Sequence, residues 1–209
     1  MRPYFGEPAP CIVGIAGELK AQVVVVGTHQ RNVLDGLEHI SVSCELLHPW
    51  AMNVVCMQAN AQFDAREAHI PTIKRVLVAT DLSAPGNAAI PFACAACGLG
   101  RLVKIIHVAP PRRPANVAPG GGGAGDLGAQ VRALVPNEAR ERWLPPEVEV
   151  LESGDVSAAI CAEAKRFGAD LVCVASHGVS HSRALHGSVT KAVLKKIRRP
   201  LLVILRPEE

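Results

Sequence analysis

The sequence has few aromatic residues, little excess charge and no long apolar run. Its 209 residues include two Trp, one Tyr and four Phe, too few to offer nucleic-acid bases a stacking surface. The formal net charge of +3 is small for a nucleic-acid-binding protein. No run of about 18 apolar residues is present, and the first residues lack the apolar centre of a secretory signal. We therefore expect a cytoplasmic protein that binds neither nucleic acid nor membrane.

The seven cysteines do not form a disulfide or metal pattern. Their number is odd and most lie inside apolar runs, which favours reduced core residues. Cys94 and Cys97 have the spacing of a redox or zinc pair, which remains an alternative, but they fall within a predicted helix, Asn87–Leu99. His177 and His181 have no carboxylate or cysteine at metal spacing, so we expect no metal site.

About fifty residues near the start of the chain recur near its end at an offset of about 148 residues. Ala21–His29 aligns with Ala169–His177, and Val54–Met57 aligns with Leu201–Ile204. Each copy has the pattern of a helix, a buried strand, a loop with Gly or His, a second helix and a second strand. The repeat predicts two structurally similar units in one chain.

The second copy is preceded by a half that the first copy lacks. Lys74–Asp81 and Leu102–Val108 are short, β-branched and almost wholly apolar, as strands buried on both faces are. A loop rich in Pro and Gly is expected over Ala109–Gly128, an amphipathic helix over Ala129–Trp143 and an edge strand over Glu147–Leu151. The remaining helices and strands are expected at 157–167, 170–175, 187–198 and 200–206.

Regular alternation of strands and helices predicts an α/β domain with an open five-stranded parallel sheet and helices on both faces. We expect a complete domain at 73–207, a linker at 63–72 and, at 1–62, an incomplete copy with only its C-terminal half. The strand at Gln22–Gly27 then lacks its central neighbour and exposes an apolar edge. We expect it to dock on the intact domain or to self-associate.

A ligand of such a sheet binds beyond the carboxyl ends of the strands, here after Asp81, Val108 and Ala175. Gly187 and Ser188 open a helix whose amide groups and dipole favour phosphate. Gly178 permits a tight turn around a phosphate, and Asp81 can accept hydrogen bonds from adenine or ribose. For each of these residues, the alternative to ligand binding is a purely structural role, in a turn or as a helix cap.

These segments resemble the universal stress protein family. Its nucleotide-binding members carry Gly-x-x-Gly, nine residues, then Gly-Ser or Gly-Thr; here Ala175-Ser176-His177-Gly178 is followed by eight residues and then Gly187-Ser188-Val189. Val78-Ala79-Thr80-Asp81 and His107-Val108 match the family's first two strand ends. The resemblance implies an ATP site, with or without Mg²⁺, made by Ala79, Thr80, Asp81, Val108, Ala175, Ser176, His177, Gly178, Arg183, Gly187, Ser188 and Val189.

The chain departs from the family pattern at two places. Ala175 replaces the first glycine and the loop is one residue short, although Arg183 could meet a phosphate. In the first copy, Gln30 and Ile40 stand where glycines are expected, so we predict that it binds no nucleotide.

The resemblance implies a stress-response or signalling module that binds ATP without dedicated catalysis and pairs through its last strands, as a homodimer or between its own domains. No catalytic residue is predicted, since the sequence has no Gly-x-x-x-x-Gly-Lys loop; slow ATP hydrolysis occurs in some relatives. The alternative is an interaction module that binds no nucleotide. A related hydrolase or nucleotidyl transferase would need a Ser-Gly-Gly-x-Asp-Ser or His-x-Gly-His loop, and neither is present.

Overall fold

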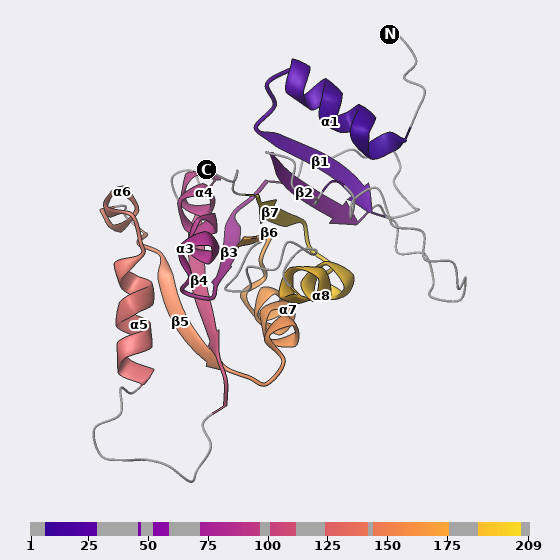
Figure 1. Cartoon of the computed structure of the whole chain (residues 1–209). Helices are drawn as coiled ribbons and strands as arrows, with labels where there is room; N and C mark the ends of the chain where they lie inside the picture. The colour runs from indigo at the N-terminus through magenta and orange to yellow at the C-terminus, as the bar shows by residue number, and fades with distance from the viewer. Residues whose placement is uncertain are drawn as a thin grey trace.

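The computed structural model describes residues 7–28, 46, 52–58, 72–96, 101–111, 124–141, 144–175 and 188–205. Helices and strands alternate along most of this length, and Figure 1 shows their arrangement. The helices are α1 (Pro8–Glu18), α3 (Ala84–Asn87), α4 (Ala89–Ala96), α5 (Ala124–Ala133), α6 (Asn137–Arg140), α7 (Val156–Phe167) and α8 (Ser188–Lys196). The strands are β1 (Val23–Thr28), β2 (Asn53–Gln58), β3 (Arg75–Thr80), β4 (Leu102–Ala109), β5 (Glu147–Glu152), β6 (Leu171–Ala175) and β7 (Leu201–Ile204).

All described strands form one seven-stranded sheet with the order β1-β2-β7-β6-β3-β4-β5. The last five strands in this order are mutually parallel and form the predicted five-stranded sheet. The two strands of the first copy are parallel to each other and extend the sheet beyond β7. In Figure 1, β1 is therefore the outermost strand on one side and β5 the outermost strand on the other.

The two copies meet where β2 pairs with β7, and this is the one antiparallel pair among the described strands. Val54 lies opposite Val203, Val55 opposite Leu202 and Cys56 opposite Leu201. Since Val54–Met57 and Leu201–Ile204 are equivalent in the repeat, the junction has a pseudo-two-fold axis at the central pair. Docking within the chain was one of the two expected arrangements, with self-association as the other, and the pairing of β2 with β7 shows the first of them.

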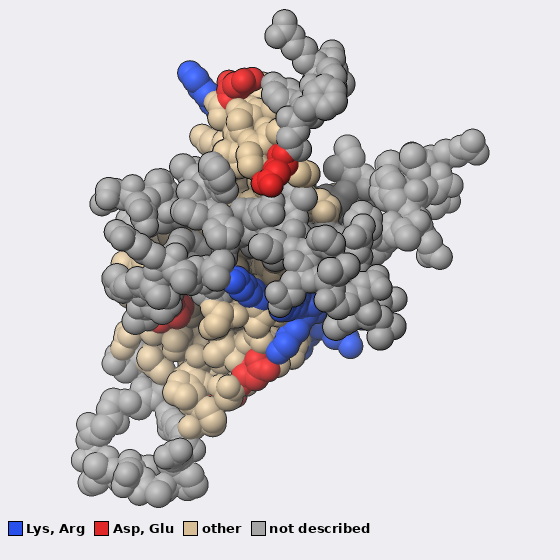
Figure 2. All heavy atoms as spheres, turned by 45° about the vertical axis from the view of Figure 1, so that its right-hand side comes forward, with Lys and Arg blue, Asp and Glu red and all other residues tan. Residues whose placement is uncertain are grey.

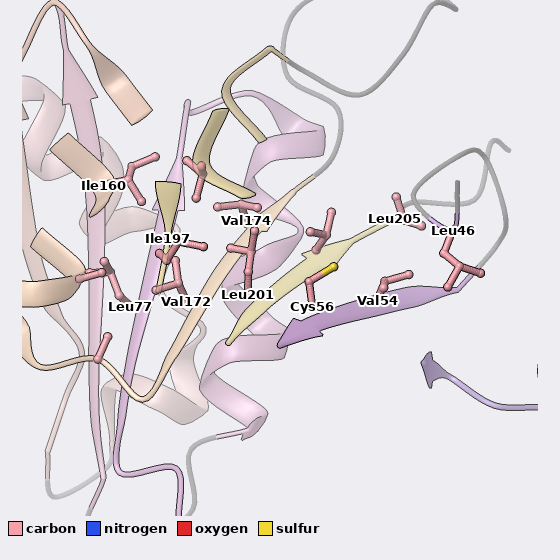
Figure 3. Packing of buried hydrophobic residues seen from close by; sticks show 14 of the residues in the cluster. Leu46, Val54, Cys56, Leu77, Ile160, Val172, Val174, Ile197, Leu201 and Leu205 are labelled. Atoms are coloured by element: carbon pink, nitrogen blue, oxygen red, sulfur yellow. The ribbon is translucent and has the colours of Figure 1, made fainter. Parts of the chain in front are cut away.

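Strand residues alternate between two apolar cores, one on each face of the sheet. Leu77, Val172 and Val174 pack with Ile160 of α7 on one face. Val76, Val78 and Cys173 pack with α4 on the other. Helices therefore cover both faces, as predicted. Figure 3 shows that the first core continues across the junction, from Leu77 past Leu201 to Val54 and Leu46 of the first copy.

The predicted helix Asn87–Leu99 differs from the structure. Helix α3 already begins at Ala84, capped by the Ser83 hydroxyl, and a break at Ala88 separates it from α4. Pro91 explains the break, because it has no amide hydrogen to donate to the carbonyl of Asn87 one turn earlier. Cys94 is buried in α4, in agreement with a core role, while Cys97 lies outside the described residues.

The segment between β4 and β5 also differs from the prediction. Helix α5 begins at Ala124, inside the region expected to be a loop up to Gly128. The single helix expected over Ala129–Trp143 is instead two helices, because Pro136 precedes a second start at Asn137. The Arg140 guanidinium donates hydrogen bonds to three carbonyl groups at the end of α5, those of Arg132, Ala133 and Val135.

Candidate functional site

Seven of the predicted site residues lie in the described part of the chain, at the carboxyl ends of β3, β4 and β6. Thr80 pairs with His107, which places Asp81 beside Val108. The Thr190 hydroxyl donates a hydrogen bond of 3.1 Å to the carbonyl of Ala175, so the first turn of α8 lies against the end of β6. The structure thus brings together Ala79, Thr80, Asp81, Val108, Ala175, Ser188 and Val189. Ser176, His177, Gly178, Arg183 and Gly187 lie outside the described residues.

The turn that follows β3 holds a left-handed residue that is not glycine. Leu82 has a φ of 67°, a conformation that costs a non-glycine residue about 1 kcal/mol. The Thr80 hydroxyl compensates by accepting a 3.0 Å hydrogen bond from the Leu82 amide and by donating a 2.6 Å bond to Asn87 Oδ1. Strained turns of this kind cluster at binding sites, which supports a functional role for this one.

This turn fixes the position of Asp81. Its Oδ1 accepts hydrogen bonds from the Ser83 amide at 3.0 Å and from the Ser83 hydroxyl at 2.6 Å. A Cβ at Gly86 would lie 1.9 Å from that oxygen, so the glycine leaves the space that the carboxylate occupies. Asp81 is exposed, and its Oδ2 has no hydrogen-bond partner among the described residues. Asp81 Oδ2 is therefore available for a ligand at the carboxyl end of β3.

Sequence reasoning identified Asp81 but missed Gly86 and Asn87, which support it. The signal for Gly86 was present, because Ser83 stands three residues before it, the distance at which a capping hydroxyl accepts an amide hydrogen bond. Asn87 had no comparable signal, since a side chain that binds back to Thr80 across a left-handed turn follows no periodic pattern.

His107 makes a further polar contact at the carboxyl ends of β3 and β4. Its Nδ1 lies 3.0 Å from the carbonyl oxygen of Thr80. Because a carbonyl oxygen only accepts, Nδ1 must donate, and the ring is held in one orientation across the two strand ends.

The first turn of α8 lies near Ala175, and the amide groups of a first helical turn have no partner within their own helix. Ser188 and Val189 are exposed, and no acidic side chain lies in this turn. Lys195 and Lys196 lie in the last turn, where they match the negative end of the helix dipole. On the face shown in Figure 2, basic side chains lie beside acidic ones. Lys196 forms an ion pair of 2.9 Å with Asp155.

A groove of about 680 Å³ lies on the face of the sheet that α4 covers. It is near the carboxyl ends of the strands but separate from the predicted nucleotide site. Neither Val108, Ala175 nor Ser188 lines it. Its lining residues are Ala21, Gln22, Asn53, Ala84, Asn87, Ala88, Pro91, Phe92, Ile204 and Leu205. The groove borders both copies, so it belongs to their junction and not to the predicted nucleotide site.

A buried charge cluster lies near the opposite, amino ends of β4 and β5. Lys104 is 3% exposed, and its Nζ lies 3.0 Å from carboxylate oxygens of Glu147 and Glu163 and in contact with Glu149. Arg166 pairs with Glu149 and Glu163, each at 2.6 Å. Burial works to lower the pKa of Lys104, but the hydrogen bonds to the three glutamates outweigh it and hold that pKa above its usual value. The cluster is far from the carboxyl ends of the strands. We therefore assign it a structural role, in fixing the register between β4 and β5.

Within the described residues there is no group of three His, Cys, Asp or Glu side chains that could hold a metal ion. No helix in this part of the chain is long and apolar enough to cross a membrane.

The sheet order defines an open α/β fold, a class of protein in which ligands generally bind beyond the carboxyl ends of the strands. The sequence profile of the universal stress protein family matches residues 72–204, so the chain belongs to that family. No curated protein matches the sequence significantly.

Solved structures of longer and shorter proteins show the same fold. A universal stress protein from Archaeoglobus fulgidus DSM 4304 is 20% identical with a TM-score of 0.68, covering 99% of this chain and 68% of its own. A putative universal stress protein from Pseudomonas aeruginosa UCBPP-PA14 is 15% identical with a TM-score of 0.64, over 96% of this chain and 69% of its own. The hypothetical protein MJ0577 is 20% identical with a TM-score of 0.51, over 66% of this chain and 99% of its own. The first two align across both copies, and the third has the length of one domain.

Proposed function

We propose that the chain is a regulatory module of the stress response that binds ATP at the carboxyl ends of β3, β4 and β6. The observation that carries the proposal is the fixed Asp81 carboxylate, whose Oδ2 has no hydrogen-bond partner among the described residues. A hydroxyl or amino group of an adenine nucleoside is the kind of donor that this oxygen can accept from.

The remaining residues have complementary roles in this proposal. Ala79 and Val108 provide small apolar surfaces beside Asp81, suited to the flat face of a base. The amide groups of Ser188 and Val189 at the start of α8 suit phosphate oxygens. Ser176, His177, Gly178, Arg183 and Gly187 complete the phosphate loop by their position in the sequence, between Ala175 and Ser188.

We propose binding without dedicated catalysis. Asp81 accepts a hydrogen bond from the Ser83 hydroxyl, but that hydroxyl also accepts the Gly86 amide hydrogen as the cap of α3, so we assign this pair a structural role. A cytoplasmic location belongs to the same proposal, because none of the five described cysteines forms a disulfide. The second candidate, an interaction module without nucleotide, is favoured by Ala175 standing where the family has glycine.

Calorimetric titration of ATP, with and without Mg²⁺, tests the proposal. We expect one nucleotide per chain, with affinity reduced at least tenfold in Asp81→Ala and in Gly187→Val, and unchanged in the exposed control Glu18→Ala. Thermal unfolding of each variant checks that the fold is retained. Absence of saturable binding to the folded wild-type chain would contradict the proposal and favour the interaction module.

A further inference from the structure

The groove at the junction of the two copies has the size and the composition of a small-molecule site. Its volume of about 680 Å³ lies within the range of about 300–1,000 Å³ that is common for such sites. Gln22 and Asn53 of the first copy line it together with Phe92 and Leu205 of the second. None of the described residues that line it is charged. A charged ligand would lose its hydration there without gaining an ion pair, so the groove suits a neutral ligand.

The side-chain amide of Asn53 has one atom engaged and one available. Asn53 is 7% exposed, and its Oδ1 accepts a 3.1 Å hydrogen bond from the Leu205 amide. Because a backbone amide only donates, this bond fixes which amide atom of Asn53 is the oxygen and which is the nitrogen. Asn53 Nδ2 has no hydrogen-bond partner among the described residues.

Nδ2 of Asn53 is also open to the groove. In the part of the chain that the structure describes, Glu163 Oε1 is the one fully buried side-chain polar atom without a hydrogen bond. Nδ2 lacks a partner and is not in this class, so it must retain accessible surface. Since Asn53 is almost wholly buried and lines the groove, that surface lies in the groove. A hydrogen-bond donor held in one orientation therefore faces it.

The other two amide side chains of the groove make weaker demands on a ligand. Asn87 is already engaged, since its Oδ1 accepts from the Thr80 hydroxyl and its Nδ2 donates to the carbonyl of Leu82. Gln22 is exposed, so water can satisfy it. Asn53 is thus the polar group for which a ligand with an acceptor oxygen supplies the missing partner.

Phe92 adds an aromatic ring to the same groove. Helix α4 has the sequence Ala-Ile-Pro-Phe-Ala-Cys-Ala-Ala, without a charged residue. Its residues Ile90, Ala93 and Cys94 are buried in the core, whereas Phe92 is 45% exposed. An exposed ring beside an apolar groove offers a flat surface on which a second ring can pack.

We propose that this groove binds a neutral molecule that has a flat ring and a carbonyl oxygen. The ring packs on Phe92, and the carbonyl oxygen accepts a hydrogen bond from Asn53 Nδ2. Such a ligand contacts both copies at once, because Asn53 belongs to the first and Phe92 to the second. The charge of ATP does not suit this groove, so the site is distinct from the proposed nucleotide site.

Nuclear magnetic resonance titration of the full chain tests the proposal, with acetophenone as the probe. We expect saturable shifts of the Asn53 side-chain amide and of the Leu205 backbone amide, with a dissociation constant of about 1 mM or below. Benzoate, which has nearly the same shape but carries a charge, should bind at least tenfold more weakly. Acetone, which has the carbonyl group but no ring, should give no saturable shift.

Two variants and a control separate the two contacts. Phe92→Ala should weaken acetophenone binding at least tenfold, whereas Leu144→Ala, at an exposed apolar position outside the groove, should leave it unchanged. Asn53→Asp keeps an acceptor for the Leu205 amide but removes the donor, and it should also weaken binding at least tenfold. Thermal unfolding checks each fold. If Asn53→Asp does not fold, the Phe92 and Leu144 pair still decides.

Three results would overturn the proposal. The first is a folded wild-type chain in which acetophenone gives no saturable shift of the Asn53 and Leu205 amides. The second is equal binding by acetophenone and benzoate, or equal behaviour of the Phe92 and Leu144 variants, either of which would indicate nonspecific adhesion. The third is a shift of the same amides with protein concentration alone, which would identify a second copy of the chain as the occupant.

Discussion

Val55 of β2 and Leu202 of β7 face each other at the centre of the antiparallel pair and occupy the same position in the repeat. The junction therefore joins two equivalent strands about a local two-fold axis, and contacts on one side of the axis recur on the other. Because one apolar core continues across it, the described residues of the first copy share their packing with those of the second.

Leu202→Ala should weaken this junction. The side chain is buried against the α4-side core, and removing buried Leu atoms typically costs about 2–5 kcal/mol. Urea unfolding should show a loss in that range in a single transition. Leu19→Ala, at a position 74% exposed, should change stability by less than about 0.5 kcal/mol. Two separate transitions in the wild type would show that the copies unfold independently, contrary to a shared core.

Thr80→Val should destabilise the turn that positions Asp81. The substitution keeps the shape but leaves the Leu82 amide and Asn87 Oδ1 without their partner, a cost of about 1–3 kcal/mol. If Asp81 binds nucleotide, the affinity for ATP should fall as well. Urea unfolding and calorimetry measure the two effects. The exposed Thr72→Val serves as the control, and equal behaviour of both variants would remove the role assigned to Thr80.

Lys104→Met should be strongly destabilising, because it leaves Glu163, at 4% exposure, with Arg166 as its one cationic partner among the described residues. Removing one member of a buried ion pair costs about 3–5 kcal/mol. Adding Glu163→Gln should recover part of this loss. A loss no greater than that of the exposed Lys74→Met would contradict the prediction.

Asp155→Asn should show a pH-dependent effect at the start of α7. Hydrogen bonds from the Ser157 hydroxyl, the Ala158 amide and Lys196 hold the pKa of Asp155 well below its usual value. Because the folded pKa lies below the unfolded value of about 3.9, its stabilising contribution is present above that pH and is lost as pH falls. The difference in Tm between wild type and variant should be constant from pH 7 to 5 and vanish under strong acid. A difference independent of pH would show that the charge does not matter.

The sequence was sufficient to predict the order of strands and helices because each strand is a short, β-branched apolar run with a polar end. β3, β4 and β6 were each placed within a residue or two. Helix boundaries were less predictable where proline interrupts them. The break before α4 could have been read from Pro91, whose missing amide hydrogen interrupts the hydrogen-bond ladder, but the apolar pattern across it favoured one continuous helix.

The candidate site was predictable where one residue acts alone. Asp81 and Ser188 stand at strand and helix ends that the pattern locates. The support for Asp81 was not predictable, because the bond between Thr80 and Asn87 depends on the left-handed Leu82, whose conformation no side-chain preference indicates. The Lys104 cluster was missed for a similar reason, since a single lysine in an apolar strand does not reveal which glutamates of β5 and α7 will surround it.

The antiparallel pairing of β2 with β7 also separates the two copies as possible receivers of a signal. The carboxyl ends of β1 and β2 lie at the side of the sheet where β6 and β3 begin, as the Asn53 side chain at the start of β2, bonded to the Leu205 amide just after β7, shows. A ligand at one set of strand ends cannot touch a ligand at the other. The paired strands β2 and β7, and the core packed on them, connect the two sets of strand ends.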